Sequence, residues 1–329
     1  MSIGPYALFP RTPFLFSSLN VQKNMLQDRI RLSRFKEAIF HTVRPGDNVI
    51  DLGTGTGILA IWAAQAGASQ VYAIEETDAA SAACAVVREN GLSDIVHVLR
   101  ANSQDVCLPC RADVLIAELV GHFIFEEGIV EYIADLREKL LKPSARIIPA
   151  AARAFIAPLH LGTAFEEITF WRSFKQVNLS AISRLAANSA YVESIGQASI
   201  IGDPQECFNV EFSKATAGLR DAKRVFRAKR NGQIDALGGW FEMTLSDGIS
   251  LSTSPRGEPT HWKQCVFPLE RPAVVHRGDL IECQITIEPF APGSKWCWKL
   301  QNATRRDFEE YHELVITHPS QSLLLDERF

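Results

Sequence analysis

Between residues 48 and 149, short apolar runs alternate with helical stretches, and this alternation limits the folds open to the chain. Strands and helices that follow one another at this pitch are typical of β-α-β units, in which crossover helices join parallel strands. The expected strands are residues 48–52, 70–74, 95–99, 114–117 and 146–148. The expected helices are residues 57–66, 78–90 and 126–140. This part of the chain is therefore predicted to form a parallel sheet covered by helices.

The pattern differs on either side of this region. Upstream, residues 21–42 carry apolar side chains at helical spacing, so helix is expected there. Downstream of Pro149, β-branched and aromatic residues alternate and are separated by turn signals, which predicts an antiparallel sheet or barrel. The strands expected in this half include residues 207–212, 239–245, 264–269 and 280–287.

Three kinds of local segment add detail to the antiparallel structure expected after Pro149. Residues 160–200 lack the strand pattern and are expected to be helical. Asn231-Gly232 and Ser246-Asp247-Gly248 are typical of hairpin turns. The basic run over residues 223–230 is therefore interpreted as the exposed strand of a hairpin and not as a nucleic-acid site.

Composition narrows the class of protein. The chain has 329 residues, enough for two domains of about 150 residues each. With 47% hydrophobic and 22% charged residues, it matches a soluble globular protein and excludes a disordered chain, a collagen and a coiled coil. The net charge of −4 argues against nucleic-acid partners, and no apolar run is long enough for a membrane span. The seven cysteines, including the pair Cys107 and Cys110, are expected to be reduced thiols in a cytoplasmic or nuclear compartment.

A glycine-rich segment, VIDLGTGTGIL over residues 49–59, stands where the first expected strand meets the first expected helix. Glycines there let the backbone turn tightly and approach a ligand closely. Dinucleotide enzymes use the spacing G-x-G-x-x-G to seat a pyrophosphate, whereas this spacing is G-x-G-x-G and Asp51 precedes it. A carboxylate would repel a pyrophosphate and suits the amino group of S-adenosylmethionine. Glu75, which ends the next apolar run, is placed to bind ribose hydroxyls. A structural turn and a nicotinamide site are the weaker alternatives.

Two further groups of residues are candidates for chemistry. Glu118 follows the fourth expected strand, at the sheet edge where α/β folds bind ligands, and Glu127 lies nine residues later. The loop between them is long enough to turn Glu127 toward Glu118. Taken alone, Glu126 and Glu127 are equally well explained as acids in the first turn of a helix. The pair His261 and Trp262 forms the third group, for which packing is the simpler explanation.

Together these segments resemble the protein arginine methyltransferase family. The glycine-rich segment is similar to the family's first cofactor motif, and residues 117–127 are similar to its double-glutamate loop. Residues 260–264, with residues 252–255 before them, resemble its Thr-His-Trp loop. Residues 25–31 resemble the segment that closes over the cofactor. The four motifs stand in the family's order, and the resemblance covers about residues 20–300.

The resemblance implies an architecture. It predicts an N-terminal helical cover segment over residues 1–42 and a Rossmann-like, S-adenosylmethionine-binding domain over residues 43–149. A β-barrel-like substrate domain would follow over residues 150–329, with a helical dimerisation arm at about 160–200. Pro149 falls at the junction of the two domains, where the family typically has a cis X-Pro bond. A homodimer is expected, without nucleic-acid or membrane partners.

The resemblance also implies roles for individual residues. Glu118 and Glu127 clamp the guanidinium of an arginine, and His122 and Trp262 contact the substrate. Asp28 pairs with His261, and this pair accepts the released proton or holds its loop shut. The residues implied to bind S-adenosylmethionine are Met25, Arg31, Asp51, Gly53, Gly55, Gly57, Glu75, Ser103 and Gln104. For Met25, packing on the apolar stripe of its helix is an equal alternative. No metal is expected.

The chain departs from the family pattern mainly on the substrate side. Residues 13–18 lack the two tyrosines of the family's cover segment. His122 replaces a tyrosine, Gln22 replaces a histidine, and Gln104 replaces a glutamate whose acceptor role an amide oxygen can keep. The predicted activity is therefore methylation of arginine in a protein or peptide. The alternatives are methylation of free arginine or another small guanidine, and an inactive cofactor-binding scaffold.

Overall fold

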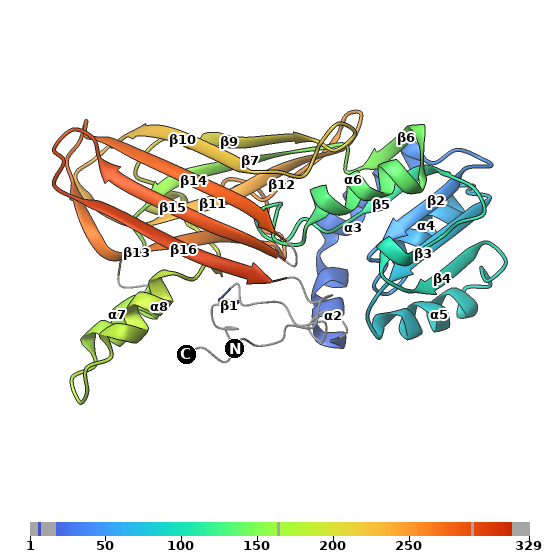
Figure 1. Ribbon diagram of the computed structural model, residues 1–329, viewed down its shortest axis with the longest axis horizontal. Helices are drawn as coiled ribbons and strands as arrows, with labels where there is room; N and C mark the ends of the chain where they lie inside the picture. The colour runs from blue at the N-terminus through green and yellow to red at the C-terminus, as the bar shows by residue number, and fades with distance from the viewer. Residues whose placement is uncertain (1–5, 8–17, 163–164, 291–292, 318–329) are drawn as a thin grey trace.

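Five parallel strands and the helices that connect them form one lobe of the protein, at the right of Figure 1. The structure is a computed structural model and describes residues 6–7, 18–162, 165–290 and 293–317. The strands of this lobe are β2 (Asn48–Leu52), β3 (Gln70–Glu75), β4 (Val96–Arg100), β5 (Ala112–Ala117) and β6 (Leu141–Ile148). The connecting helices are α4 (Ile58–Gln65), α5 (Ala79–Glu89) and α6 (Ile129–Lys139). The predicted parallel sheet with crossover helices is confirmed.

The order of the strands locates a ligand-binding edge. The sheet runs β4-β3-β2-β5-β6, so the chain leaves β2 on one side and later returns to its other side. In open α/β sheets, ligands bind at the carboxyl ends of the strands beside such a reversal. Gly53 follows β2 directly and Glu118 follows β5 directly, so both lie at that edge.

The N-terminal segment forms two helices, α2 (Leu19–Gln27) and α3 (Arg29–Thr42), instead of the uninterrupted helix expected across residues 25–31. The break falls at Asp28, whose backbone is extended and whose side chain accepts a 2.9 Å hydrogen bond from the Arg31 backbone N–H. A carboxylate in this position caps the first turn of a helix. The apolar spacing over residues 21–42 does not indicate this break, because a polar capping residue makes it.

Two antiparallel sheets form the second lobe, at the left of Figure 1. One has the order β1-β8-β13-β11-β7-β9, with β12 paired to β11, and the other has the order β10-β14-β15-β16. The strands are β1 (Tyr6–Ala7), β7 (Ala151–Leu159), β8 (Tyr191–Glu193), β9 (Gln205–Glu211), β10 (Arg220–Arg227), β11 (Gly232–Ser246), β12 (Ile249–Ser252), β13 (Gln264–Val275), β14 (Leu280–Phe290), β15 (Gly293–Asn302) and β16 (Glu309–Thr317). Phe267 of the first sheet contacts Trp296 and Trp298 of the second, so buried aromatic rings join the two sheets.

One of the two expected hairpins forms. Ser246-Asp247-Gly248 connects the paired strands β11 and β12, and Gly248 has the positive φ of 75° that such a turn requires. Asn231-Gly232 does not make a hairpin, because β10 pairs with β14 and β11 belongs to the other sheet. The Asn231 side chain instead accepts a 2.8 Å hydrogen bond from the backbone N–H of Arg277. The basic strand β10 is an edge strand of the smaller sheet.

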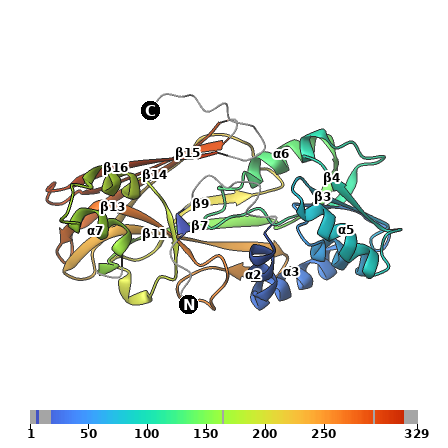
Figure 2. The same ribbon diagram turned by 90° about the horizontal axis from the view of Figure 1, so that it is seen from below.

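A helical hairpin interrupts the second lobe and extends away from it in Figure 1. In Figure 2, seen from below, its helix α7 overlies the strands of this lobe. It consists of α7 (Glu166–Ser173) and α8 (Ser180–Ala187), so only part of the expected helical region over residues 160–200 is helix and β8 follows within it. We call residues 165–188 the arm. The peptide bond between Ile148 and Pro149, where the two lobes meet, is cis. Within the described residues, every helix is too short or too polar to cross a membrane.

Candidate active site

The glycine-rich loop after β2 adopts a backbone that favours glycine at three positions. Gly53, Gly55 and Gly57 have φ values of 71°, 56° and 84°, and Gly57 precedes the first residue of α4. A Cβ atom on Gly53 would lie 2.9 Å from Leu119 Cδ2, and one on Gly55 would lie 2.9 Å from Gln22 Oε1. The loop therefore passes closely beneath α2 and the segment that follows β5.

Asp51, near the end of β2, carries a fully buried carboxyl group with an exposed fraction of 0%. The Thr54 hydroxyl donates to Oδ2 over 2.6 Å, whereas Oδ1 has no hydrogen-bond partner among the described residues. Burial raises the pKa of Asp51 to about 7, and the hydrogen bond from Thr54 offsets only part of this effect. A buried acceptor of this kind suits a cationic or hydrogen-bond-donating ligand.

Glu75, at the end of β3, braces the glycine-rich loop. Its Oε2 accepts from the Gly55 N–H over 3.0 Å, and its Oε1 accepts from the N–H and hydroxyl of Thr77 over 3.0 and 2.7 Å. The side chain is buried at the carboxyl edge of the sheet. The predicted ribose-binding carboxylate thus has a structural task that the sequence did not indicate.

The remaining predicted cofactor residues lie on both sides of this loop. Ser103 begins a short 3₁₀ turn after β4, and its buried hydroxyl has no partner within the described part of the chain. The neighbouring Gln104 is exposed and its backbone N–H bonds to the Asn102 side chain. Met25 is partly buried on α2.

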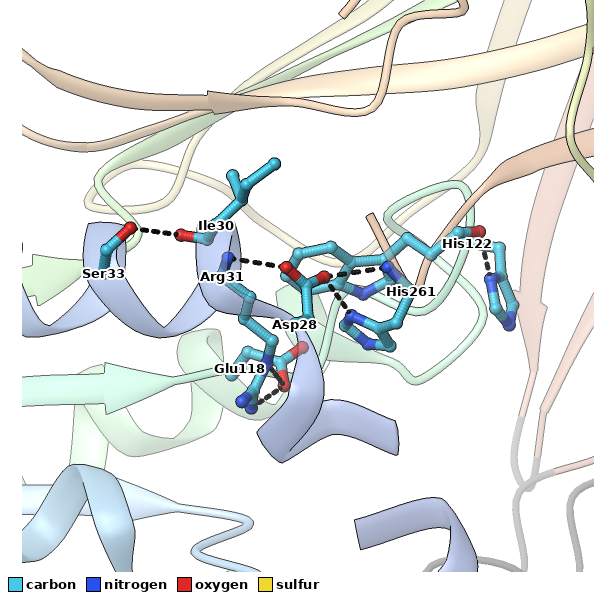
Figure 3. Close-up of polar contacts among 8 residues, drawn as sticks. Asp28, Ile30, Arg31, Ser33, Glu118, His122 and His261 are labelled. Atoms are coloured by element: carbon cyan, nitrogen blue, oxygen red, sulfur yellow. Dashed lines mark hydrogen bonds and ion pairs between the residues drawn. The ribbon is translucent and has the colours of Figure 1, made fainter. Parts of the chain in front are cut away.

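An ion pair joins two predicted site residues that come from different segments, as Figure 3 shows. Arg31 of α3 donates to Glu118 through Nε over 3.0 Å and through Nη2 over 2.5 Å, and both bonds end on Oε2. Both side chains are more than nine-tenths buried. The guanidinium of Arg31 therefore fixes Glu118 at the carboxyl end of β5.

A second polar contact joins the two lobes (Figure 3). The backbone N–H and the ring Nδ1 of His261 each lie 2.8 Å from Asp28 Oδ2. Burial alone would raise the pKa of Asp28, but the hydrogen bonds from His261 and Arg31 outweigh burial, and the pKa lies below its ordinary value. The pairing of Asp28 with His261 that the resemblance implied is thus present, and it ties the α2–α3 junction to the loop between β12 and β13.

His261 also faces an open groove of about 390 Å³ beside this pair. The groove is lined by the α2–α3 junction, with Asn24, Gln27 and Arg29, and by Pro259 of the opposing loop. The ring is therefore accessible from outside while its Nδ1 is held by Asp28.

The loop between β5 and α6, residues 118–127, separates its two adjacent acids. Glu126 is 2% exposed and accepts a 2.9 Å hydrogen bond from the His122 backbone N–H. Glu127 is only partly buried. Helix α6 begins at Ile129, so neither acid lies in its first turn, and the alternative explanation of both as first-turn acids is wrong.

The same loop reaches the loop of His261. His122 Nδ1 lies 2.7 Å from the backbone carbonyl oxygen of Trp262, which it therefore contacts as a donor. The Trp262 indole is 2% exposed and packs edge-on against Phe241 at 5.7 Å between ring centres. The indole therefore belongs to the packed core, and the Trp262 carbonyl connects two site loops. The substrate contact expected of Trp262 stays a prediction.

Comparison with known proteins gives the lineage. The family model described as the arginine methyltransferase oligomerization subdomain matches residues 150–296, and a ribosomal protein L11 methyltransferase model matches residues 35–149. The chain is 31% identical over 302 residues to protein arginine N-methyltransferase PRMT10 of Arabidopsis thaliana, covering 80% of this chain and 79% of the relative. It is 32% identical over 311 residues to the PRMT10 of Oryza sativa subsp. japonica, covering 83% and 81%. The chain belongs to the protein arginine N-methyltransferase family.

Solved structures of this family share the fold. The crystal structure of Arabidopsis thaliana protein arginine methyltransferase 10, described as uniquely open, has a TM-score of 0.78 at 27% identity over 92% of this chain and 99% of that one. A chain of the Trypanosoma brucei PRMT1 enzyme-prozyme complex with AdoHcy has a TM-score of 0.83 at 21% identity, covering 91% and 99%. The predicted class, a Rossmann-like parallel-sheet domain followed by an antiparallel domain, is confirmed.

The structure shows three site residues that the sequence analysis did not predict. These are Thr54 and Thr77, which hold the two cofactor-side carboxylates, and the buried Glu126. The hydroxyls follow Asp51 and Glu75 at short spacing, a local signal that was available. Within the predicted cover segment over residues 1–42, the stretch that lacks the family's two tyrosines, residues 13–18, lies outside the described residues except for Ser18. Among the described residues, no cluster of three or more His, Cys, Asp or Glu side chains is arranged to hold a metal ion.

Proposed function

We propose that this protein transfers a methyl group from S-adenosylmethionine to a guanidinium nitrogen of arginine in a protein or peptide. The observation that carries this proposal is Glu118, which lies at the carboxyl edge of the sheet. Among the described residues, only one of its two carboxylate oxygens accepts a hydrogen bond. Both bonds from Arg31 end on Oε2, which leaves Oε1 for a second guanidinium. The relatives named as protein arginine N-methyltransferases support the same reaction.

The residues on the β2–β3 side fit the cofactor. Two buried polar atoms there, Asp51 Oδ1 and Ser103 Oγ, have no partner in the described residues, and the glycine-rich loop offers close backbone approach. Asp51 would pair with the amino group, and Glu75 would accept from the ribose. Arg31 keeps Nη1 for the carboxylate, because its Nε and Nη2 are already bound to Glu118. When bound, S-adenosylmethionine supplies a methyl group on a positively charged sulfur.

The two glutamates would act on the substrate guanidinium. Arginine is protonated at physiological pH and its nitrogen lone pairs are delocalised, so it is a poor nucleophile. Glu118 and Glu127 would hold it by charge-assisted hydrogen bonds and draw positive charge toward the nitrogens they bind. They would also aim one terminal nitrogen at the methyl group. Orientation and electrostatics then supply most of the rate enhancement.

The Asp28–His261 pair would act on the proton that methyl transfer releases. His261 donates from Nδ1 to Asp28, so its Nε2 carries the lone pair in the neutral ring. The ring lines the groove beside the α2–α3 junction, and its Nε2 would accept the proton that the reaction releases. The backbone bond from His261 to the same oxygen holds this loop in place, so both functions fit one geometry.

The arm is proposed to join two copies of the chain. Its side chains Phe170, Val177, Ile182 and Leu185 are exposed, and Leu185 reaches 69%. Exposed apolar residues gathered on one projecting element favour a partner surface. The matched family model is the oligomerization subdomain, which supports a homodimer. All seven cysteines are free thiols, which supports a cytoplasmic or nuclear location.

The proposal is tested with labelled S-adenosylmethionine on an arginine-rich peptide mixture and on free L-arginine, with mass spectrometry of both products. Label in peptide arginine is the expected result. Label in free arginine alone would overturn the protein substrate and support the small-guanidine alternative. Cofactor binding without label in either substrate would support an inactive scaffold.

A further inference from the structure

The loop between Glu118 and Glu127 is inserted into the β lobe through Phe123. This side chain has an exposed fraction of 0%. Its ring meets Phe267 of β13 edge-on at 5.5 Å and Trp296 of β15 at 6.1 Å between ring centres. A residue of the parallel-sheet lobe thus belongs to the aromatic core of the other lobe.

Gly239 of β11 provides the space that the Phe123 ring fills. A Cβ atom on Gly239 would lie 2.6 Å from Phe123 Cε2 and 2.9 Å from Phe123 Cδ2. Carbon atoms do not approach this closely, because van der Waals contact requires about 3.5 Å or more. The ring therefore rests directly on the glycine backbone, and any larger residue would displace it.

The neighbouring residues of the loop are held by the same lobe. Phe125 packs edge-on against Phe208 of β9 at 5.4 Å, and the Arg220 guanidinium lies 4.6 Å from the centre of the Phe125 ring. His122 is bound to the Trp262 carbonyl, as described above. The loop that carries both glutamates therefore takes its position from strands on both sheets of the β lobe.

The backbone of the loop shows that this position is imposed. Ile124, between Phe123 and Phe125, has a φ of 77° and is fully buried. A β-branched residue in this left-handed region is strained. Such a conformation persists only where surrounding contacts hold it, and here the anchored rings on either side do so.

We propose that Gly239 is a positioning residue for methyl transfer: by receiving Phe123, it sets the place of the loop that carries Glu127 relative to Glu118 and the cofactor. This inference rests on the proposed function. A methyl group at position 239 would push Phe123 and its loop outward. A misplacement of about 1 Å at reacting groups can cost about 100-fold in rate. The glycine-rich loop and Asp51 lie outside this contact, so cofactor affinity should be retained.

Gly238 offers a matched control on the same strand. A Cβ atom there would lie 2.7 Å from Leu159 Cδ1 and 3.0 Å from Ile195 Cδ1, and no atom of the glutamate loop lies among its nearest neighbours. Gly238→Ala should therefore disturb the β lobe by similar crowding without touching the loop. A second variant, Phe123→Leu combined with Gly239→Ala, removes the ring edge that the new methyl group would meet.

The experiment measures four quantities in each variant: kcat and KM on an arginine peptide, the Kd of S-adenosylhomocysteine, and amide hydrogen exchange of residues 118–127. For Gly239→Ala we expect kcat to fall by about 10- to 100-fold, faster exchange in the loop, and a Kd close to that of the unaltered protein. Gly238→Ala should keep kcat and loop exchange, and Phe123→Leu should restore part of the kcat lost in Gly239→Ala.

Equal losses of kcat in Gly238→Ala and Gly239→Ala, or unchanged loop exchange in Gly239→Ala, would overturn the inference. If Gly239→Ala does not fold, Phe123→Leu alone provides the test, since loosening the ring should also raise loop exchange and lower kcat. If the unaltered protein methylates no arginine, the proposed function fails. Hydrogen exchange still decides whether Gly239 positions the loop.

Discussion

Cofactor affinity should depend on the protonation of Asp51, which lies fully buried beneath the glycine-rich loop. Burial raises its pKa to about 7 from an ordinary value of 3.8, so the carboxyl group changes charge within the physiological range. Only the ionised form pairs with the amino cation of the cofactor. An acid with a pKa of about 7 is about one-tenth ionised at pH 6 and about nine-tenths ionised at pH 8. The Kd of S-adenosylhomocysteine should therefore be about 10-fold larger at pH 6 than at pH 8.

The measurement is isothermal titration calorimetry between pH 5.5 and 8.5. 5′-Methylthioadenosine is the matched ligand, because it keeps the adenosine and sulfur but lacks the amino acid part. Its affinity should stay constant over this range. Asp51→Asn should weaken S-adenosylhomocysteine binding at pH 8 and abolish the pH dependence. A constant Kd for S-adenosylhomocysteine, or the same slope for both ligands, would refute the assignment of Asp51 to the amino group.

The raised pKa of Asp51 also makes the free energy of unfolding of the ligand-free protein depend on pH. Between about pH 4 and pH 7 the folded protein keeps the proton on Asp51, whereas the unfolded chain has released it. The free energy of unfolding contributed by this group therefore decreases as the pH rises through that range. Denaturant titrations of Asp51→Asn should lack this decrease.

Three other predictions follow from the site and the arm. Glu127→Gln should lower methyl transfer by about 100-fold or more while S-adenosylhomocysteine binding is kept; near-normal turnover in a radiolabel assay would contradict the clamp. Asp28→Ala removes a helix cap and two hydrogen bonds to His261, so it should lower the free energy of unfolding by about 2–4 kcal/mol at neutral pH. An unchanged denaturation midpoint would argue against a stabilising role for the contact between Asp28 and His261. Because the pKa of Asp28 is lowered, this contribution should be complete above about pH 4 and be lost as the pH falls through the lowered pKa. Leu185→Arg should give a monomer in light scattering, and a dimer of unchanged mass would show that the arm is not the interface.

Features encoded by short segments could be predicted from the sequence. The five parallel strands were foreseen because buried parallel strands read as continuous apolar runs, and β2 matches its predicted bounds. The glycine-rich loop was foreseen because its spacing and preceding acid are local. The alternation of β-branched and aromatic residues downstream of Pro149 predicted the antiparallel lobe. The ordered motifs indicated the family, and with it the pairing of Asp28 with His261.

Features that depend on contacts between distant segments could not be predicted in this way. Asn231-Gly232 has the composition of a hairpin turn, but strand pairing across the lobe assigns β10 and β11 to different sheets. Glu126 and Glu127 are adjacent and chemically alike, and only the packed loop shows that Glu126 is turned into the core. The fit of Phe123 against Gly239 joins positions far apart in the chain, and nothing local marks either residue.

The two lobes contribute to the site in different ways. The parallel-sheet lobe and its N-terminal helices hold the groups proposed to face the cofactor, namely the glycine-rich loop, Asp51 and Arg31. The β lobe holds the loops proposed to face the substrate, through His261, the Trp262 carbonyl and the contact of Gly239 with Phe123. Changes at β2 and β3 should therefore alter cofactor Kd first, whereas changes deep in the β lobe should alter kcat first. Under the proposed function, turnover should require the β lobe, because the strained loop that carries Glu127 packs against it.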